Sequence, residues 1–423
     1  MSTDFLSSPV VSPSASAPAS AGFAPASRRQ AVPASAKLIL KLLAKLRHGA
    51  LTLTTPDGQL LHFGEQPIFT SSPVTLELKS WDVFTQALRS GDIGFAEGYI
   101  AGQWSTNNLT GLIALLARNR ASIEELVYGS WWGRLMYRVR HLMNRNSRAG
   151  SRRNIADHYD IGNEFYKLWL DGSMTYSSAL FTEAAGGDLA LAQTEKYRAI
   201  LGELHVNAGD TVLEIGCGWG GFAEIAADAG LHVTGLTLSH EQLAYARRRL
   251  AAAGLEARTD LRLCDYRDCA GQYDAIASIE MFEAVGESYW PSYFECVARN
   301  LKPGGRACVQ TIVIADELFA RYREGTDFIQ QYIFPGGMLP SPSRFRALAA
   351  QHGLSVTAER RFGIDYADTL LAWRGAFHAR LAEVRAQGFD EQFIRTWEFY
   401  LCYCEAAFRE HNTDVMHFTL VKA

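Results

Sequence analysis

The chain has 423 residues, enough for two domains, and its 48% hydrophobic and 20% charged residues are the balance of an ordinary globular protein. A formal net charge of −4 excludes a general electrostatic attraction to nucleic acid, so any basic surface must be local. The seven cysteines include no Cys-x-x-Cys pair, which argues against a disulfide framework or a zinc site and favours a reducing cytosol.

Four segments follow one another along the chain. Residues 1–35 are rich in Ser, Ala and Pro, a composition that predicts a disordered tail. We expect a smaller α+β accessory domain at 36–143, a polar linker at 144–153 and the catalytic domain at 154–423. No stretch reaches the ~20 apolar residues of a spanning helix, and the first residues lack the pattern of a secretory signal. The sequence therefore predicts a cytoplasmic protein whose membrane contact is peripheral.

The accessory domain is predicted to contain two basic amphipathic helices. In KLILKLLAKLRHG, one face carries Lys37, Lys41 and Lys45. The opposite face is apolar and consists of Leu38, Ile39, Leu42, Leu43 and Leu46. A hairpin over 51–64 follows, and a second helix begins after Ser130 and leads into basic residues up to Arg153. Two interpretations remain open for these helices: a solvated face, or adsorption to anionic lipid head groups.

A glycine-rich turn at 210–230, DTVLEIGCGWGGFAEIAADAG, is the strongest local signal. A short apolar strand ends at Glu214 and Ile215, and the turn leads directly into a helix. This pattern predicts the first βα unit of a doubly wound α/β sheet, whose ligands bind at the carboxyl ends of the strands. Gly216, Gly218 and Gly220 allow the backbone to approach a ligand closely.

Further strands are predicted in LHVTGLTLS, LRLCDYRD, YDAIASIEMFEAVG and NLKPGGRACVQTIVI, which gives a mostly parallel sheet. The second strand ends near Thr237, with Gln242 on the next helix, where the ribose and adenine of a cofactor should lie. The third ends at Asp265 and Tyr266, which suit hydrogen bonding to adenine and stacking on it. The E-x-G-x-G-x-G order resembles class I S-adenosylmethionine (SAM) methyltransferases and differs from the dinucleotide fingerprint.

Seven motifs in order carry a more specific resemblance: HYDIGNEFYKLWLDGSMTYSSALF, VLEIGCGWGG, GLTLSHEQ, SIEMFEAVG, YIFPGGMLPS, FGIDYADTLLAW and YLCYCEAAFR. Over about residues 154–423 the chain resembles the bacterial cyclopropane-fatty-acyl-phospholipid synthases and the mycolic acid cyclopropane synthases. The resemblance implies cofactor contacts from Tyr176, Ser177, Gly216, Thr237, Gln242, Tyr266 and Ile279.

The same resemblance implies that a bicarbonate ion is bound beside the reactive methyl group. Its binding positions correspond here to Ser178, Glu283, Gln310, Ile312 and Tyr366. Ser178 and Gln310 replace a cysteine and a histidine of the family, so the ion is expected to bind more weakly. The family also has a cysteine at the position of Cys404, for which a small buried apolar role is expected.

The reaction that the family implies is methyl transfer from SAM to a cis double bond of a phospholipid acyl chain, followed by loss of a proton. Proton loss from the new methyl group closes a cyclopropane ring. The altered anion site leaves open a methylene or methyl-branched product without ring closure. An apolar tunnel for the acyl chain is expected after the fifth strand, from Leu318, Phe319, Tyr322, Phe328, Ile329, Tyr332, Ile333, Phe334, Met338 and Leu339.

Two other classes compete with this interpretation. A nucleic-acid methyltransferase is disfavoured because the fourth strand ends in SIEMFE and the chain is acidic overall. A non-catalytic lipid-binding protein with a degenerate anion site is disfavoured by the presence of Glu283 and Tyr366. We therefore expect an enzyme that acts at the inner face of the membrane, and whether it forms a homodimer stays open.

Overall fold

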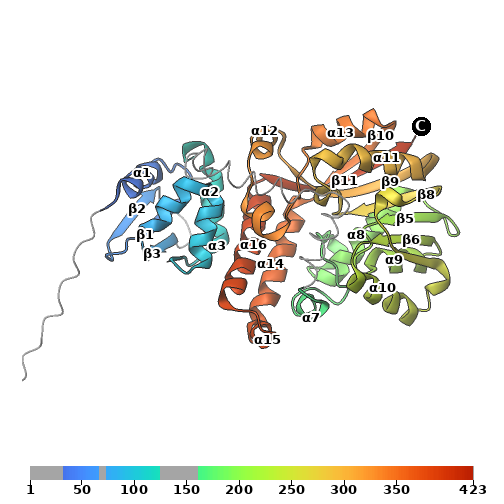
Figure 1. Ribbon diagram of the computed structural model, residues 1–423, viewed down its shortest axis with the longest axis horizontal. Helices are drawn as coiled ribbons and strands as arrows, with labels where there is room; N and C mark the ends of the chain where they lie inside the picture. Colours follow the sequence, from blue (N-terminus) through green and yellow to red (C-terminus); the bar gives the residue numbers. More distant parts are fainter. Residues whose placement is uncertain (1–31, 66–72, 124–160, 423) are drawn as a thin grey trace, which may run out of the picture. The chain divides into compact units, whose positions relative to one another are not determined.

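The computed structural model describes residues 32–65, 73–123 and 161–422 (Figure 1). The predicted linker, the second basic helix and nearly all of the predicted tail lie outside these residues. The described residues all belong to one compact unit. In the described part of the chain, no helix is both long and apolar enough to cross a membrane.

The first described part is a small α+β arrangement (Figure 1). Its sheet has the order β2-β1-β3-β4. The strands are β1 (Ala50–Thr54), β2 (Leu60–Gly64), β3 (Val74–Leu78) and β4 (Trp104–Ser105). The helices are α1 (Ala34–Leu43), α2 (Asp82–Ile100), α3 (Leu109–Arg118) and the short η1 (Arg120–Ser122). The antiparallel β1–β2 pair confirms the predicted hairpin, and Gly58 in its turn has a φ of 82°.

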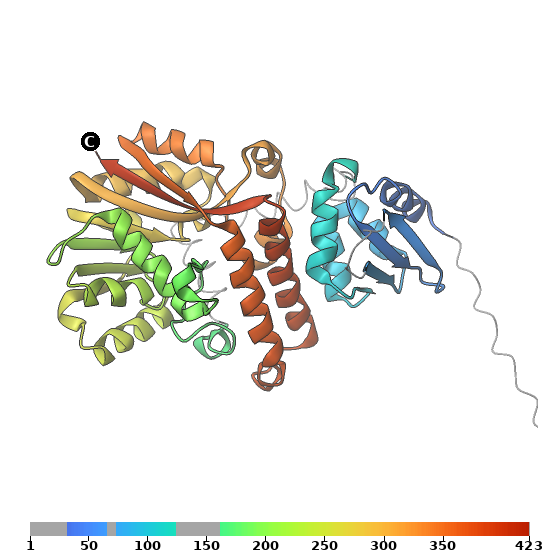
Figure 2. The ribbon, with the colours of Figure 1, turned by 180° about the vertical axis from the view of Figure 1, so that it is seen from behind.

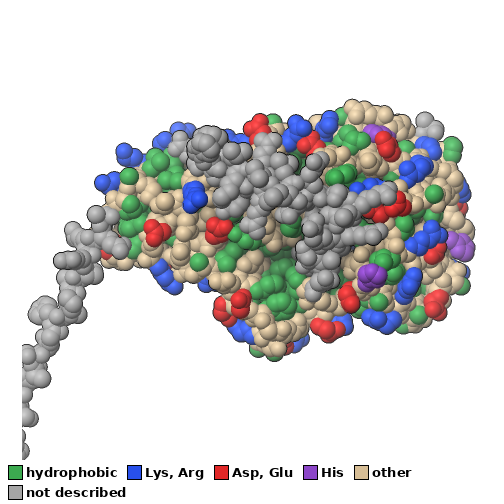
Figure 3. Space-filling view, in the orientation of Figure 1, with side chains coloured by type: hydrophobic (Ala, Val, Ile, Leu, Met, Phe, Trp, Pro, Cys, Tyr) green, Lys and Arg blue, Asp and Glu red, His purple; other side chains and the backbone are tan. Residues whose placement is uncertain are grey.

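Helix α1 confirms most of the predicted amphipathic pattern. Its apolar face buries Ile39, Leu42 and Leu43, and Leu46 is buried just beyond the helix. Leu38 is 40% exposed, so its placement on the buried face was wrong: it lies next to Lys37 on the solvent side. Basic side chains are scattered over the end of the molecule that carries α1 (Figure 3).

The second sheet has seven strands in the order β10-β11-β9-β8-β5-β6-β7. They are β5 (Thr211–Ile215), β6 (His232–Thr237), β7 (Thr259–Leu263), β8 (Tyr273–Ile279), β9 (Leu301–Ile314), β10 (Leu354–Arg361) and β11 (Thr413–Lys422). Strands β9, β8, β5, β6 and β7 are parallel, and β11 pairs antiparallel with both β9 and β10. The predicted mostly parallel α/β sheet is confirmed.

Helices cover both faces of this sheet. One apolar cluster joins Val212 of β5 to helices α8 (Leu189–Leu204), α9 (Gly221–Asp228) and α10 (His240–Ala252). A separate cluster joins Leu213, the next residue, to α11 (Trp290–Asn300) and α13 (Pro342–Gln351). Alternate residues of a buried strand therefore pack on opposite helical layers, as the two-residue period of a strand requires.

A pair of long helices, α14 (Gly363–Ala379) and α16 (Glu391–Arg409), lies beside the sheet, and the short α15 (Leu381–Ala386) connects them at one end (Figure 2). The remaining helical elements are α7 (Asn163–Tyr166), η2 (Glu183–Ala185), η3 (Glu256–Arg258), η4 (Tyr266–Asp268), η5 (Phe282–Ala284), η6 (Glu287–Tyr289), α12 (Asp316–Glu324) and η7 (Ile329–Ile333). One apolar cluster includes residues of α1–α3 and of α14 and α16.

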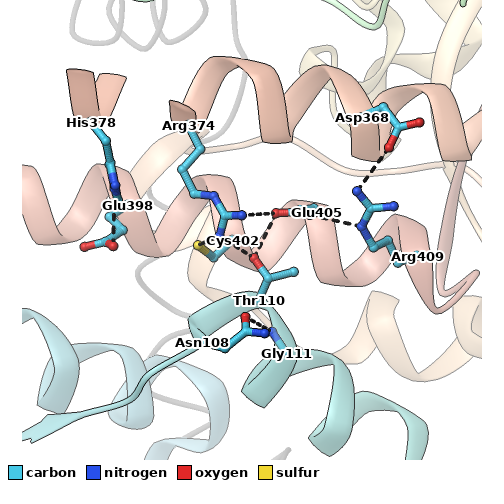
Figure 4. Close-up of polar contacts among 10 residues, drawn as sticks. All are labelled: Asn108, Thr110, Gly111, Asp368, Arg374, His378, Glu398, Cys402, Glu405 and Arg409. Carbon is cyan, nitrogen blue, oxygen red and sulfur yellow. Dashed lines mark hydrogen bonds and ion pairs between the residues drawn. The ribbon is translucent and has the colours of Figure 1, made fainter. Parts of the chain in front are cut away.

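Polar contacts add to this apolar packing between α3 and α16 (Figure 4). The hydroxyl of Thr110 donates to Oε2 of Glu405 at 2.8 Å, and Arg374 and Arg409 also pair with that buried carboxylate. Arg118 of α3 and Glu410, the residue that follows α16, form a more exposed ion pair. The first part of the chain is thus attached to the α14–α16 pair by a buried, fully partnered carboxylate.

Candidate active site

A cavity of about 330 Å³ opens at the carboxyl ends of β5, β6, β7 and β8. Its lining runs from the glycine-rich turn after β5 to aromatic residues of α14, α16 and the η7 region. The predicted site residues that line it are Tyr176, Ser177, Glu214, Gly216, Gly218, Thr237, Gln242, Asp265, Tyr266, Ile279, Glu283, Ile312, Tyr366 and Cys404. Ser178 and Gln310 lie just behind the wall, fully buried. The fold therefore brings nearly all predicted residues to one place.

The glycine turn after β5 uses its three glycines differently. Gly216 has a φ of 91°, and a Cβ there would meet the side chain of Met281 at 3.0 Å. Gly218, which lines the cavity, has a φ of 50° and open space where its Cβ would lie. Gly220 instead packs against Ala246 of α10, at 3.0 Å from a built Cβ, and is not part of the lining. Gly216 and Gly218 line the cavity, but only Gly218 has open space where a side chain would lie.

Glu214 is the buried carboxyl at the end of β5. It is 2% exposed, and burial raises its pKa to about 8, although Arg249 and Lys196 act in the opposite direction. Its Oε2 atom has no hydrogen-bond partner among the described residues. An unpartnered buried acceptor that lines a cavity suits a cationic donor, such as the amino group of the methionine portion of SAM.

Polar groups at the ends of β6 and β7 frame the next part of the cavity. Thr237 donates to Gln242 at 3.0 Å. Asp265 accepts two hydrogen bonds from the guanidinium of Arg267, at 2.8 and 2.6 Å. The hydroxyl of Tyr266 is buried without a partner in the described part of the chain. These donors and acceptors, with an aromatic ring among them, are the kinds of group that bind a nucleoside, and the predicted contacts stay a prediction.

Lys196 of α8 is a functional residue that the sequence analysis missed. Its buried Nζ donates to the hydroxyl of Ser177 at 2.6 Å and to Gln193 at 2.7 Å. Burial lowers its pKa to about 7, while Glu280 and Glu214 favour its charged form. Lys196 thus holds the Ser177 segment in place by a hydrogen bond. Its ammonium group also interacts electrostatically with Glu280 and with Glu214, which both line the cavity.

Glu280, also missed, is the centre of the predicted anion site. Its Oε1 accepts from the backbone N–H of Ser178 and from Nε2 of Gln310, both at 2.8 Å. Its Oε2 accepts from the hydroxyl of Tyr366 at 2.6 Å. Ser178 therefore contributes its backbone, since its own hydroxyl donates to the carbonyl of Ala179. Three of the five groups predicted to hold a separate anion instead hold a side chain of the protein.

Glu283 lies on the other side of the same site. Its carboxylate accepts from the hydroxyl of Thr311 at 2.8 Å and from the backbone N–H of Ile312 at 3.2 Å. Burial and the neighbouring Glu280 raise its pKa to about 8, so it is neutral near pH 7. The end of strand β8 therefore places two carboxyl groups, Glu280 and Glu283, at this centre, where the resemblance implied only Glu283.

The far part of the cavity is apolar and aromatic. Of the ten residues expected to form an acyl tunnel, five line it: Tyr322, Ile329, Phe334, Met338 and Leu339. The others serve elsewhere; Phe328 and Ile333 are buried in the core, and Tyr332 is 39% exposed. Cys404 also lines this part, and burial raises the pKa of its thiol, which keeps it protonated. No thiolate chemistry is therefore expected from Cys404.

A parallel sheet with a glycine turn after its first strand, acidic and aromatic groups at the next strand ends and an adjoining apolar cavity defines a SAM-dependent methyltransferase of class I. The family model for mycolic acid cyclopropane synthetase matches residues 146–418. The chain belongs to this family, so an enzyme of the cyclopropane synthase type, as the sequence predicted, is confirmed.

Individual relatives agree with this assignment. The chain is 42% identical over 343 residues to the tuberculostearic acid methyltransferase UfaA1 of Mycobacterium tuberculosis, covering 79% of this chain and 80% of the relative. It is 34% identical over 351 residues to the cyclopropane-fatty-acyl-phospholipid synthase of Escherichia coli strain K12, covering 82% and 87%. The solved mycolic acid cyclopropane synthase CmaA1, a complex with SAH and CTAB, matches with a TM-score of 0.60 and 31% identity over 64% of this chain and 98% of its own.

Proposed function

We propose that the enzyme transfers the methyl group of SAM to a cis double bond in an unsaturated acyl chain of a phospholipid and then removes a proton to form a cyclopropane ring. The observation that carries the proposal is the single cavity that joins the glycine turn to an aromatic, apolar pocket, with two carboxyl groups between them. The relatives named as fatty-acyl and mycolic acid synthases support the acyl substrate.

When bound, SAM supplies an electrophilic methyl group. The chain's own residues do the rest: Glu214 and the turn at Gly216 and Gly218 orient the methionine portion, and Thr237 and Tyr266 frame the nucleoside. Methyl transfer to an alkene leaves a cation in mid-chain, and aromatic faces stabilise such a cation. Tyr176, Phe334, Tyr366 and Tyr400 line the cavity for this role.

The apolar part of the cavity offsets the cost of taking an acyl chain out of a bilayer. Each CH₂ group is worth about 0.8 kcal/mol of transfer free energy, so about nine carbons cost on the order of 7 kcal/mol. Contact with the membrane is proposed to be peripheral and at its cytoplasmic face. The exposed Lys37, Lys41 and Lys45 of the α1 region support attraction to anionic head groups.

A methylene or methyl-branched product without ring closure is a second candidate. The groups expected to hold bicarbonate contact Glu280 instead, so the base that follows methyl transfer differs from the one that the resemblance implies, and the product stays to be tested. The relative named a tuberculostearic acid methyltransferase also differs by name from the synthases that close rings.

The test uses SAM with a CD₃ methyl group and vesicles of a monounsaturated phospholipid. A cyclopropane ring or a methylene group keeps two deuterium atoms, because the base removes one from the transferred CD₃ group. An olefin formed by proton loss from the acyl chain itself keeps all three. Mass spectrometry of the released fatty acids counts the label, and fragmentation separates a ring from a methylene. Absence of label in any acyl chain would refute the proposed function.

A further inference from the structure

Three donors converge on one carboxylate at the end of β8. The N–H of Ser178, the amide of Gln310 and the hydroxyl of Tyr366 all point at Glu280, at 2.6–2.8 Å. These three donors come from three separate elements: the segment before α8, strand β9 and helix α14. We call this set of donors the cradle. Buried donors need an acceptor, and here the carboxylate of Glu280 is the acceptor for all three donors of the cradle.

The donors are themselves held in orientation. His417 of β11 lies opposite Gln310 of β9, and its Nε2 is 2.9 Å from Oε1 of Gln310. Burial lowers the pKa of His417 to about 3, so the ring is neutral and its Nε2–H donates to the Gln310 oxygen. The amide NH₂ of Gln310 is thereby turned toward Glu280. His417 is a positioning residue for the cradle.

The backbone of Glu280 is in a costly conformation. Its φ is 50°, in the left-handed region that favours glycine. Strained residues persist where the surrounding structure fixes them, and they cluster at functional sites. At Glu280 this backbone places a side chain that lines the reaction cavity and reaches all three donors.

Resting on the proposed function, we propose that Glu280 is the built-in anion of the cradle, in the place where a separate ion such as bicarbonate would bind, and that it is the base of the reaction. Bicarbonate does not fit the cradle as it stands, because its donors are already used. Burial raises the pKa of Glu280, while the hydrogen bonds from Tyr366, Ser178 and Gln310 and the nearby Lys196 act in the opposite direction. The three donors around Glu280, which Glu283 lacks, are the geometric reason for assigning the negative charge of the pair to Glu280.

As the methyl carbon bonds to one alkene carbon, its bond to sulfur breaks and sulfur keeps the electron pair. The other alkene carbon becomes the cation. An oxygen of the Glu280 carboxylate takes a proton from the transferred methyl group, and the electron pair of that C–H bond forms the new carbon–carbon bond of the ring. Glu280 ends as a neutral acid and later releases its proton to solvent.

Occupancy of the cradle is tested without turnover, by ¹³C NMR titration of labelled bicarbonate. Wild type is expected to show no saturable binding. Glu280→Gly, which also suits the φ of 50°, frees the three donors and should bind the ion, whereas Glu280→Gln keeps the cradle filled and should not. Glu287→Gln, which removes a carboxyl paired with Arg323 outside the cavity, is the matched control and should behave as wild type. Saturable binding to wild type as strong as to Glu280→Gly would overturn the proposal.

Turnover tests the role as base, with SAH calorimetry and thermal melts confirming that each variant folds and binds cofactor product. Wild type should keep its rate, within about twofold, in bicarbonate-free buffer. Loss of a general base typically costs 10²–10⁴-fold, so Glu280→Gln should fall by at least ~100-fold. Glu280→Gly should fall likewise and recover at least about tenfold with added bicarbonate.

The outcomes separate the two proposals. A wild-type rate that requires bicarbonate, or a Glu280→Gln variant with the wild-type rate, would overturn the assignment of the base. If wild type methylates no acyl chain at all, the proposed function fails and the base role fails with it. The bicarbonate titration still decides in that case whether Glu280 is the resident anion, since it needs no lipid substrate.

Discussion

Glu283 should destabilise the folded protein at neutral pH, and its replacement by Gln should reveal how much. The carboxyl is buried beside Glu280, and its pKa is raised from 4.5 to about 8. The pKa of Glu283 is higher in the folded state than in the unfolded state. Its favourable contribution to the free energy of unfolding is therefore complete below about pH 4.5 and is lost as the pH rises toward 8. At ~1.4 kcal/mol per pKa unit, the cost at pH 7 is about 3 kcal/mol.

Gln matches the neutral acid in shape: its oxygen accepts from the Ile312 N–H, and its NH₂ group donates to the Thr311 hydroxyl. The melting temperature of Glu283→Gln should therefore be close to that of wild type near pH 4.5. The variant's melting temperature should exceed that of wild type by a growing margin as the pH rises toward 8. Melting curves of both proteins over pH 4.5–9, with Glu287→Gln as control, measure the difference. Equal differences at all pH values would refute the reasoning.

Three further predictions concern cofactor, membrane and domain contacts. Gly218→Val should abolish SAM binding in calorimetry while the protein stays folded, because its branched side chain fills the open space at the turn; unchanged affinity would contradict the assignment. Binding to anionic vesicles should weaken as salt rises, since screening shortens to ~3 Å at 1 M, and equal binding to neutral vesicles at every salt concentration would refute it. Thr110→Val should lower the free energy of unfolding in denaturant by about 1.5–3 kcal/mol, because it removes a hydrogen bond to a buried charge. Arg118→Met, at the exposed ion pair, should lower it by less than about 1 kcal/mol. Equal losses would argue against the buried network.

The sequence predicted the parts of the site that depend on local pattern. The strand, glycine turn and helix around Gly216 form a continuous motif, so periodicity and turn chemistry sufficed. Strands β10 and β11 were not predicted, although β11 pairs with both β9 and β10 and brings His417 to Gln310. His417 and Gln310 are 107 residues apart in the sequence, and antiparallel pairing over such a separation leaves no local signal.

The sequence around the two missed residues, Lys196 and Glu280, did not indicate that they lie at the site. Lys196 occurs in QTEKYR, which reads as an ordinary solvated helix face, and its burial follows only from how α8 packs. Glu280 and Glu283 are three residues apart in SIEMFE, a spacing that was visible in the sequence. Which of the two meets Ser178, Gln310 and Tyr366 depends on the φ of Glu280, and no propensity predicts a positive φ for glutamate.

The first part of the chain supports the cavity directly. Asp92 of α2 accepts from the hydroxyl of Tyr403 at 2.8 Å and from the backbone N–H of Phe328 at 3.1 Å. Tyr403 and Asp327 both line the cavity. Burial raises the pKa of Asp92 to about 6 and that of Asp327 to about 7, with Asp92 adding to the latter shift. A helix of the predicted accessory domain therefore stabilises the apolar end of the site. Residues on both sides of the predicted linker at 144–153 support the same active site.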